Sequence, residues 1–245
     1  MNKYKLIIEY DGNNFVGWQR QENGNSVQES IEKSIKLLTS EKVIVYGAGR
    51  TDSGVHAKGQ VAHFEISKRI SNYKIRDGLN QYLRPKSIAI LSSEEVSNDF
   101  HARFSAKMRT YQYKIINRRS PLTIDKNFAW VIFKKLKIAD MKIASLNFLG
   151  KHDFNSFRSI NCQSSSSIKT IENFEVKEVK DNILIDVSAK SFLHSQVRIM
   201  VGTLVEVGKG KLNPDAILKI IKSNDRSKAG PTAPAHGLYL MKVQY

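Results

Sequence analysis

The order of two apolar periodicities constrains the fold of this chain most strongly. Apolar residues alternate from Tyr4 to Tyr10, as in a strand with one buried face, and stop at Asp11-Gly12. Helical spacing then runs from Val27 to Leu38, behind a capping box of Ser26 and Glu29. Further strands are expected at 43–46, 60–66 and 88–96, with a helix at about 73–83 before Pro85. The resulting order, β-α-β-β-α-β, is the ferredoxin-like pattern.

The second half of the chain repeats this order. Expected elements are a strand at 111–116, a helix at 138–149, a hairpin of strands at 168–179 and 183–189, a helix at 193–207, a helix beginning at Asn213-Pro214, and a strand at 238–243. We therefore predict the α/β (α+β) class, with two ferredoxin-like, RRM-like halves sharing an extended, mixed, mainly antiparallel sheet with a basic cleft. The boundary near 100–109 gives an N-terminal domain, 1–104, and a C-terminal domain, 105–245.

A glycine-rich loop separates two of the expected strands. It reads Gly-Ala-Gly-Arg-Thr-Asp-Ser-Gly-Val-His-Ala over 47–57. Three glycines in eight residues suit a backbone that turns sharply or approaches a ligand closely. Their spacing does not match the dinucleotide-binding fingerprint. Asp52 alone is typical of a turn residue that caps its own backbone, but the whole run, with Arg50, Gly54 and His56, favours a reactive carboxylate.

Charge and composition favour a polyanionic partner. The chain has 245 residues and a net charge of +16, from 39 Lys and Arg against 23 Asp and Glu. Such an excess promotes RNA or DNA binding through counterion release, although nucleotide bias also enriches lysine. The single cysteine, Cys162, excludes an internal disulfide and a cysteine-rich zinc site, consistent with a reducing, cytoplasmic setting. No signal peptide and no membrane-spanning apolar run are expected.

A second arginine lies on an apolar helix. Arg198 is flanked by Val197 and Val201, where an unpaired charge would be costly. A solvent-facing arginine is the simpler interpretation, but the apolar neighbours favour a partner carboxylate, and we expect that partner to be Asp52.

Several segments together resemble one family. The glycine-rich loop is similar to the catalytic segment of the tRNA pseudouridine synthase A family, in which the aspartate is the nucleophile. Residues 192–202 resemble its Phe-Leu-His-x-x-Val-Arg-x-x-Val-Gly motif, and 109–113 its Arg-x-Tyr-x-Tyr strand. Residues 100–106 and 232–240 also resemble family segments. The matches run in the expected order over nearly the whole chain.

The resemblance implies an isomerase that converts uridine to pseudouridine at positions 38, 39 and 40 of the tRNA anticodon stem-loop. It implies Asp52 as nucleophile, Arg50 and Arg198 as its charge partners, Tyr111 against the target base and Leu238 against the pocket. Arg50 would also fill the stack that a flipped base leaves. The reaction needs no cofactor and no metal. The family is homodimeric, with one tRNA reached by both subunits.

Less specific signals give further candidates for RNA binding, namely Trp18, Arg20, Arg103 and Arg109. A tryptophan such as Trp18, in a glycine-containing loop, is more often a packing residue, and Tyr111 is equally consistent with a core position. The main alternative function is a non-catalytic RNA-binding protein in which Asp52 is a turn residue. An RNA hydrolase is disfavoured, because neither a metal-ligand cluster nor a paired acid accompanies Asp52.

Overall fold

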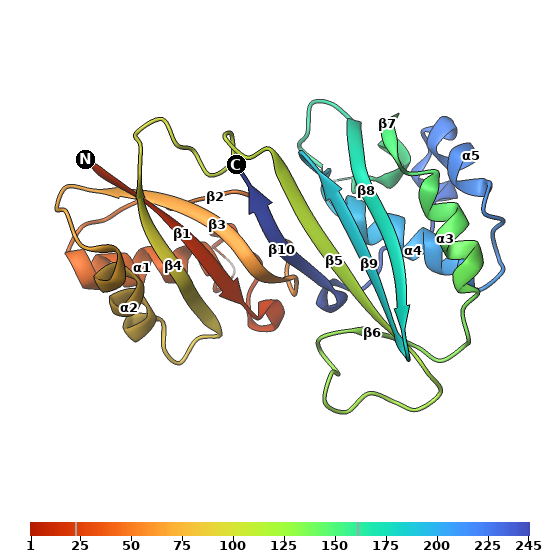
Figure 1. Ribbon diagram of the computed structural model, residues 1–245, viewed down its shortest axis with the longest axis horizontal. Coiled ribbons are helices and arrows are strands. Elements are labelled where there is room, and N and C mark those ends of the chain that lie inside the picture. The colour runs from red at the N-terminus through yellow and green to blue at the C-terminus, as the bar shows by residue number, and fades with distance from the viewer. Residues whose placement is uncertain (23, 161) are drawn as a thin grey trace. The chain divides into compact units, whose positions relative to one another are not determined.

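The computed structural model describes residues 1–22, 24–160 and 162–245 (Figure 1). The chain divides into two compact units. Unit 1 contains Met1–Lys107 and Tyr239–Tyr245, and unit 2 contains Met108–Leu238. The final segment was expected in the second domain, 105–245, but it groups with the first unit.

Unit 1 is built on a sheet with strand order β4-β1-β3-β10, and β2 also pairs with β3. The strands are β1 (Asn2–Tyr10), β2 (Tyr46–Gly47), β3 (His56–Ile66), β4 (Ile88–Val96) and β10 (Leu238–Gln244). β1 lies antiparallel to both β3 and β4. β10 is parallel to β3, with Tyr239 opposite His56. Through this pairing the end of the chain joins the sheet of unit 1.

Two helices cover the apolar side of this sheet. The alternation predicted for β1 leaves Tyr4, Leu6 and Ile8 fully buried. They share the core with α1 (Val27–Thr39) and α2 (Asn72–Leu83), which pack against each other. The N-cap half of the predicted capping box is confirmed, because the Glu29 backbone N–H donates to the Ser26 side chain at the start of α1. The Glu29 carboxylate pairs with Lys33.

Unit 2 has the strand order β5-β9-β8-β7, and β6 pairs with β5 in parallel. Its strands are β5 (Met108–Asn117), β6 (Trp130–Ile132), β7 (Gly150–Asp153), β8 (Ile168–Val179) and β9 (Asn182–Ala189). Its helices are α3 (Ile138–Leu146), α4 (Gln196–Gly208) and α5 (Ala216–Ser223), grouped together in Figure 1. Short 3-10 helices complete the chain: η1 (Gly12–Asn14), η2 (Asn155–Phe157), η3 (Arg226–Lys228) and η4 (Ala235–Gly237).

The α/β class is confirmed, with corrections of detail. The strand expected at 43–46 is reduced to Tyr46–Gly47. α4 begins at Gln196 rather than 193, because Ser195 adopts a left-handed conformation with φ 59°. α5 begins at Ala216, later than Asn213-Pro214. β6 and β7 were not predicted.

Across the described ranges 1–22, 24–160 and 162–245, no helix combines the length and apolarity needed to cross a membrane.

Candidate active site

The glycine-rich loop begins at the end of β2 and closes as β3 starts at His56. Its tip is a tight turn, in which the Val55 N–H donates to the Asp52 carbonyl at 3.2 Å. Gly54 has φ +77° in this turn, a conformation that glycine adopts without steric cost. Asp52 is partly exposed and Arg50 is exposed. The loop therefore presents both side chains away from the core.

The segment after β1 packs against the loop and is hydrogen-bonded to it. The Trp18 N–H donates to the Thr51 carbonyl at 3.1 Å, and the Ser53 hydroxyl donates to the Phe15 carbonyl at 3.1 Å. Gly17, with φ +118°, lies so close that a Cβ there would stand 2.6 Å from the Thr51 oxygen. Residues on both sides of Asp52 are thus fixed to one neighbouring segment.

A buried polar group anchors the start of β3. His56 is fully buried, and its Nδ1 accepts the Gly12 N–H at 3.0 Å, with Asp11 Oδ1 at 3.1 Å from the same nitrogen. Its ring stacks on Tyr239 of β10, with centroids 4.8 Å apart. The sequence indicates His56 only as a member of the loop motif. The structure gives it the role of joining the loop to the end of β1 and to β10.

Gln60 holds the other side of the loop. Its amide nitrogen donates to the Gly49 carbonyl at 2.8 Å, and the Gly49 N–H lies 3.4 Å from Gln60 Oε1. The side chain has no exposed surface. Sequence reasoning missed this residue, although a polar amide within a largely apolar strand was an available signal.

Trp18 lies beneath the loop. Its ring is 2% exposed and packs so closely on Gly47 that a Cβ there would stand 2.5 Å from the indole. Tyr10 lies beside it, with ring centroids 6.2 Å apart. This placement gives Trp18 a packing role, and it does not support the prediction that Trp18 contacts RNA.

The three arginines predicted to bind RNA have different surroundings. Arg20 is largely exposed, with Nη1 3.3 Å from Glu32. Arg103 is exposed, and its guanidinium lies 5.5 Å from the ring centroid of Phe104, a phenylalanine that is 74% exposed. Arg109 is buried and donates to the Lys190 carbonyl within unit 2. Arg20 and Arg103 are therefore accessible to a ligand, whereas Arg109 is mostly covered.

In unit 2, Arg198 projects from α4 against the chain segment before β10. Its Nε donates to the Ala233 carbonyl at 2.8 Å, and the Ala233 N–H donates to the Arg198 carbonyl at 3.1 Å. Gly202 permits this approach, because a Cβ there would lie 1.7 Å from the Pro231 oxygen. Arg198 thus has a backbone partner in its own unit, and its pairing with Asp52 stays a prediction.

The other two predicted pocket residues of unit 2 are almost fully buried. Tyr111 packs edge-on against Phe192, with ring centroids 5.3 Å apart. Leu238 follows a segment anchored by Tyr113, whose hydroxyl donates to the Pro234 carbonyl at 2.7 Å. Burial raises the pKa of Tyr113 and keeps this hydroxyl a donor. The part of the chain that the structure describes contains no cluster of three metal-ligating side chains.

These features define a class of site, a partly exposed aspartate and an exposed arginine on a loop held rigidly by an α/β scaffold. A family model described as tRNA pseudouridine synthase matches residues 6–105 and 144–245. The tRNA pseudouridine synthase A of Anaplasma phagocytophilum (strain HZ) is 52% identical over 245 residues, which cover 99% of this chain and 100% of that protein. The protein of the same name from Maricaulis maris (strain MCS10) is 48% identical over 245 residues, 100% of this chain and 98% of that protein.

The chain belongs to the tRNA pseudouridine synthase family. A solved structure, the "Crystal Structure of a Cbf5-Nop10-Gar1 Complex", is 12% identical with a TM-score of 0.34, covering 82% of this chain and 53% of that one. That similarity is too slight to carry an argument.

Proposed function

We propose that Asp52 is the nucleophile with which this chain, a tRNA pseudouridine synthase and therefore an isomerase, converts uridine to pseudouridine in tRNA. The observation that carries the assignment is the support of the Asp52 loop by three separate groups. Trp18 holds the residue before Asp52, Phe15 holds the residue after it, and Gln60 holds Gly49. A loop fixed in this way keeps a partly exposed carboxylate in one position, which favours catalysis over simple turn formation.

The reaction requires little beyond such a carboxylate. The N1–C1′ bond of uridine breaks, the uracil turns, and C5 bonds to C1′, while the proton from C5 is lost and N1 ends protonated. Atoms and electrons balance without an oxidant or a second substrate. Asp52 contributes as a nucleophile at the ribose or the ring, or as a base at C2′, and is regenerated at the end.

Charge partners and a base contact complete the proposed site. Arg50 is exposed two residues from Asp52, so it can fill the stack vacated by the flipped base. We assign Arg198 as the second charge partner, and Tyr111 and Leu238 as the surfaces against the uracil. Their support is the family motif in each segment and, for Arg198, an orientation fixed by Ala233.

The proposed substrate region is the anticodon arm, at tRNA positions 38, 39 and 40. A stem-loop suits this chemistry, because proteins recognise RNA by shape and through unpaired bases. The net charge of +16 favours a polyanion. We further propose that the protein acts as a homodimer in the cytoplasm, where the tRNA substrate is found. Light scattering should then give about twice the chain mass of 27.8 kDa.

The test uses purified protein and an unmodified tRNA transcript. Pseudouridine is mapped by carbodiimide labelling and primer extension for wild type, Asp52→Asn and Asp77→Asn. Asp77 is a matched control, because its carboxylate is exposed on α2 and paired with Arg76. We expect stops in the anticodon arm for wild type and Asp77→Asn only, with RNA affinity nearly equal in all three. Turnover by Asp52→Asn would refute the assignment of Asp52 as the nucleophile. RNA binding by wild type without any modification would favour a non-catalytic RNA-binding protein.

A further inference from the structure

Val45, just before the glycine-rich loop, has an unusual backbone environment. Sequence periodicity predicted a strand over 43–46, but pairing with β3 begins only at Tyr46. The Val45 N–H instead donates to Glu32 Oε1 at 3.0 Å, and the Val45 carbonyl accepts from Gln28 Nε2 at 3.1 Å. Two side chains of α1 therefore take the place of a neighbouring strand.

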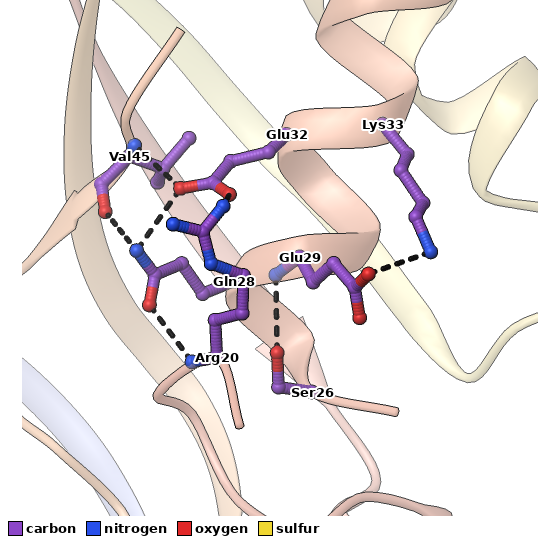
Figure 2. A network of polar contacts seen from close by, with 7 residues as sticks. All are labelled: Arg20, Ser26, Gln28, Glu29, Glu32, Lys33 and Val45. Atoms are coloured by element: carbon purple, nitrogen blue, oxygen red, sulfur yellow. Dashed lines mark hydrogen bonds and ion pairs between the residues drawn. The ribbon is translucent and has the colours of Figure 1, made fainter. Parts of the chain in front are cut away.

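Gln28 and Glu32 also bind the segment that packs against the loop. The side-chain Oε1 of Gln28 accepts the Arg20 N–H at 3.0 Å, and the backbone N–H of Gln28 donates to the Trp18 carbonyl at 3.0 Å. Glu32 Oε2 lies 3.3 Å from Arg20 Nη1. Gln28 Nε2 donates to Glu32 Oε1 at 3.0 Å, which ties the pair together. Figure 2 shows Gln28 and Glu32 converging on Val45 from one side of α1.

These contacts join the two chain segments that meet under the catalytic loop. Trp18 supports Gly47 with its ring and Thr51 with its backbone N–H. Val45 lies two residues before Gly47, so a shift of Val45 relative to Trp18 would move the base of the loop. Gln28 bonds both segments and is 6% exposed, and Glu32 is 8% exposed.

We infer that Gln28 and Glu32 are positioning residues that set the location of Asp52 by fixing Val45 against Trp18. Neither residue is placed to touch the substrate in this role. The inference rests on the proposed function of Asp52. Its physical basis is that a displacement of a catalytic group by about 1 Å costs on the order of 100-fold in rate, and that buried amide and carboxylate contacts of this kind hold one geometry.

The decisive variant is Gln28→Glu. It keeps the shape of the side chain but replaces the donor Nε2 with an oxygen, which then faces Glu32 Oε1 and the Val45 carbonyl. Glu29→Gln is the matched control. Glu29 lies on the same helix, one residue from Gln28, and its carboxylate pairs only with Lys33 at 2.7 Å among the contacts drawn in Figure 2. Gln28→Met removes the side-chain hydrogen bonds to Arg20, Glu32 and Val45 without adding charge.

Two measurements separate positioning from simple stability. The first is the single-turnover rate of pseudouridine formation at saturating tRNA, corrected for the folded fraction, together with the RNA dissociation constant. The second is amide hydrogen exchange over 46–55, compared with 182–189 of β9. The exchange measurement needs no catalysis. It therefore tests whether Gln28 and Glu32 fix Val45 against Trp18 even if wild-type protein forms no pseudouridine and the proposed function fails.

We expect Gln28→Glu to lower the single-turnover rate about 10- to 100-fold, with the dissociation constant changed less than about 3-fold. Exchange should rise over 46–55 and stay at the wild-type level in β9. Glu29→Gln should match wild type in all readouts.

Three results would overturn the inference. A Gln28→Glu protein with wild-type rate and exchange would show that the position of the loop does not depend on the Gln28 bonds to Val45. A rate loss that vanishes after correction for folded protein would reduce both residues to a role in stability. Failure of both Gln28→Glu and Gln28→Met to fold would show that the pair is required for the fold itself rather than for loop position.

Discussion

Gly17 approaches the backbone of Thr51 so closely that a Cβ on the glycine would lie 2.6 Å from the Thr51 carbonyl oxygen. This contact fixes the residue before Asp52. Gly17 also has a positive φ of +118°. No other residue type satisfies both conditions without moving the backbone.

Gly17→Ala should therefore displace the loop. We expect a loss of about 1–3 kcal/mol in unfolding free energy and a fall in turnover of at least about 10-fold. Gly150→Ala is the matched control, because Gly150 also has positive φ, +90°, but a Cβ there would meet only His152 Nε2, at an ordinary contact distance of 3.9 Å. Denaturant unfolding and single-turnover assays measure the two effects. Equal loss of turnover in both variants would contradict a specific contact at Thr51.

The Gln60 side chain provides a second test of loop support. Gln60→Glu converts the group that donates to the Gly49 carbonyl into an acceptor, in a position with no exposed surface. An unsatisfied or repelled buried polar group costs about 1–3 kcal/mol, so both stability and turnover should fall. Gln81→Glu, exposed on α2, makes the same chemical change where no effect is expected. If the two variants behave alike in thermal unfolding and turnover, the bonds between Gln60 and Gly49 have no role in supporting the loop.

His63 gives unit 1 a pH-dependent stability. Burial is the main factor that lowers the pKa of His63 from 6.5 to about 4, and the positive charges of His101 and Lys3 add to it. Its Nδ1 accepts the Ala102 N–H at 3.1 Å, a bond that requires the neutral ring. Between pH 6.5 and 4 the unfolded chain binds a proton that the folded protein does not, so stability falls as the pH falls through this window.

We expect the His63 contribution to lower the unfolding free energy by about 1–3 kcal/mol between pH 7 and pH 4.5. Denaturant titrations of wild type and His63→Gln at several pH values measure it as the difference in slope. His101, whose pKa is also lowered by burial, contributes in the same direction. Identical pH dependence in wild type and His63→Gln would exclude His63 as the titrating group.

How much the sequence revealed depended on whether a feature was local. The strands 88–96 and 168–179 were predicted with the bounds observed, because alternation within one segment determines them. The strand at 43–46 was wrong, since Val45 bonds Glu32 and Gln28, and such long-range side-chain contacts leave no periodic signal.

The candidate site shows the same division. The loop motif predicts Asp52 and Arg50 as site residues, because that prediction depends only on their neighbours in sequence. Gln60 and the role of Gly17 were missed, because both depend on which backbone atoms lie opposite in the folded chain. For Trp18 the sequence is consistent with both a packing role and an RNA contact, and its burial against Gly47 favours packing.

Arg103 is the accessible arginine whose effect on RNA binding is easiest to isolate. It is exposed beside Phe104, so Arg103→Gln should weaken tRNA binding with little change in the single-turnover rate at saturating tRNA. If Arg103 contacts one phosphate, the slope of log K against log salt should decrease in magnitude by about 0.7–0.9. Arg76→Gln is the control, because Arg76 is an exposed arginine on α2 paired with Asp77. Fluorescence anisotropy over a series of salt concentrations gives both slopes. An unchanged slope for Arg103→Gln, or an equal decrease for Arg76→Gln, would remove Arg103 from the RNA-binding surface, because a general loss of positive charge and a specific phosphate contact differ in this comparison.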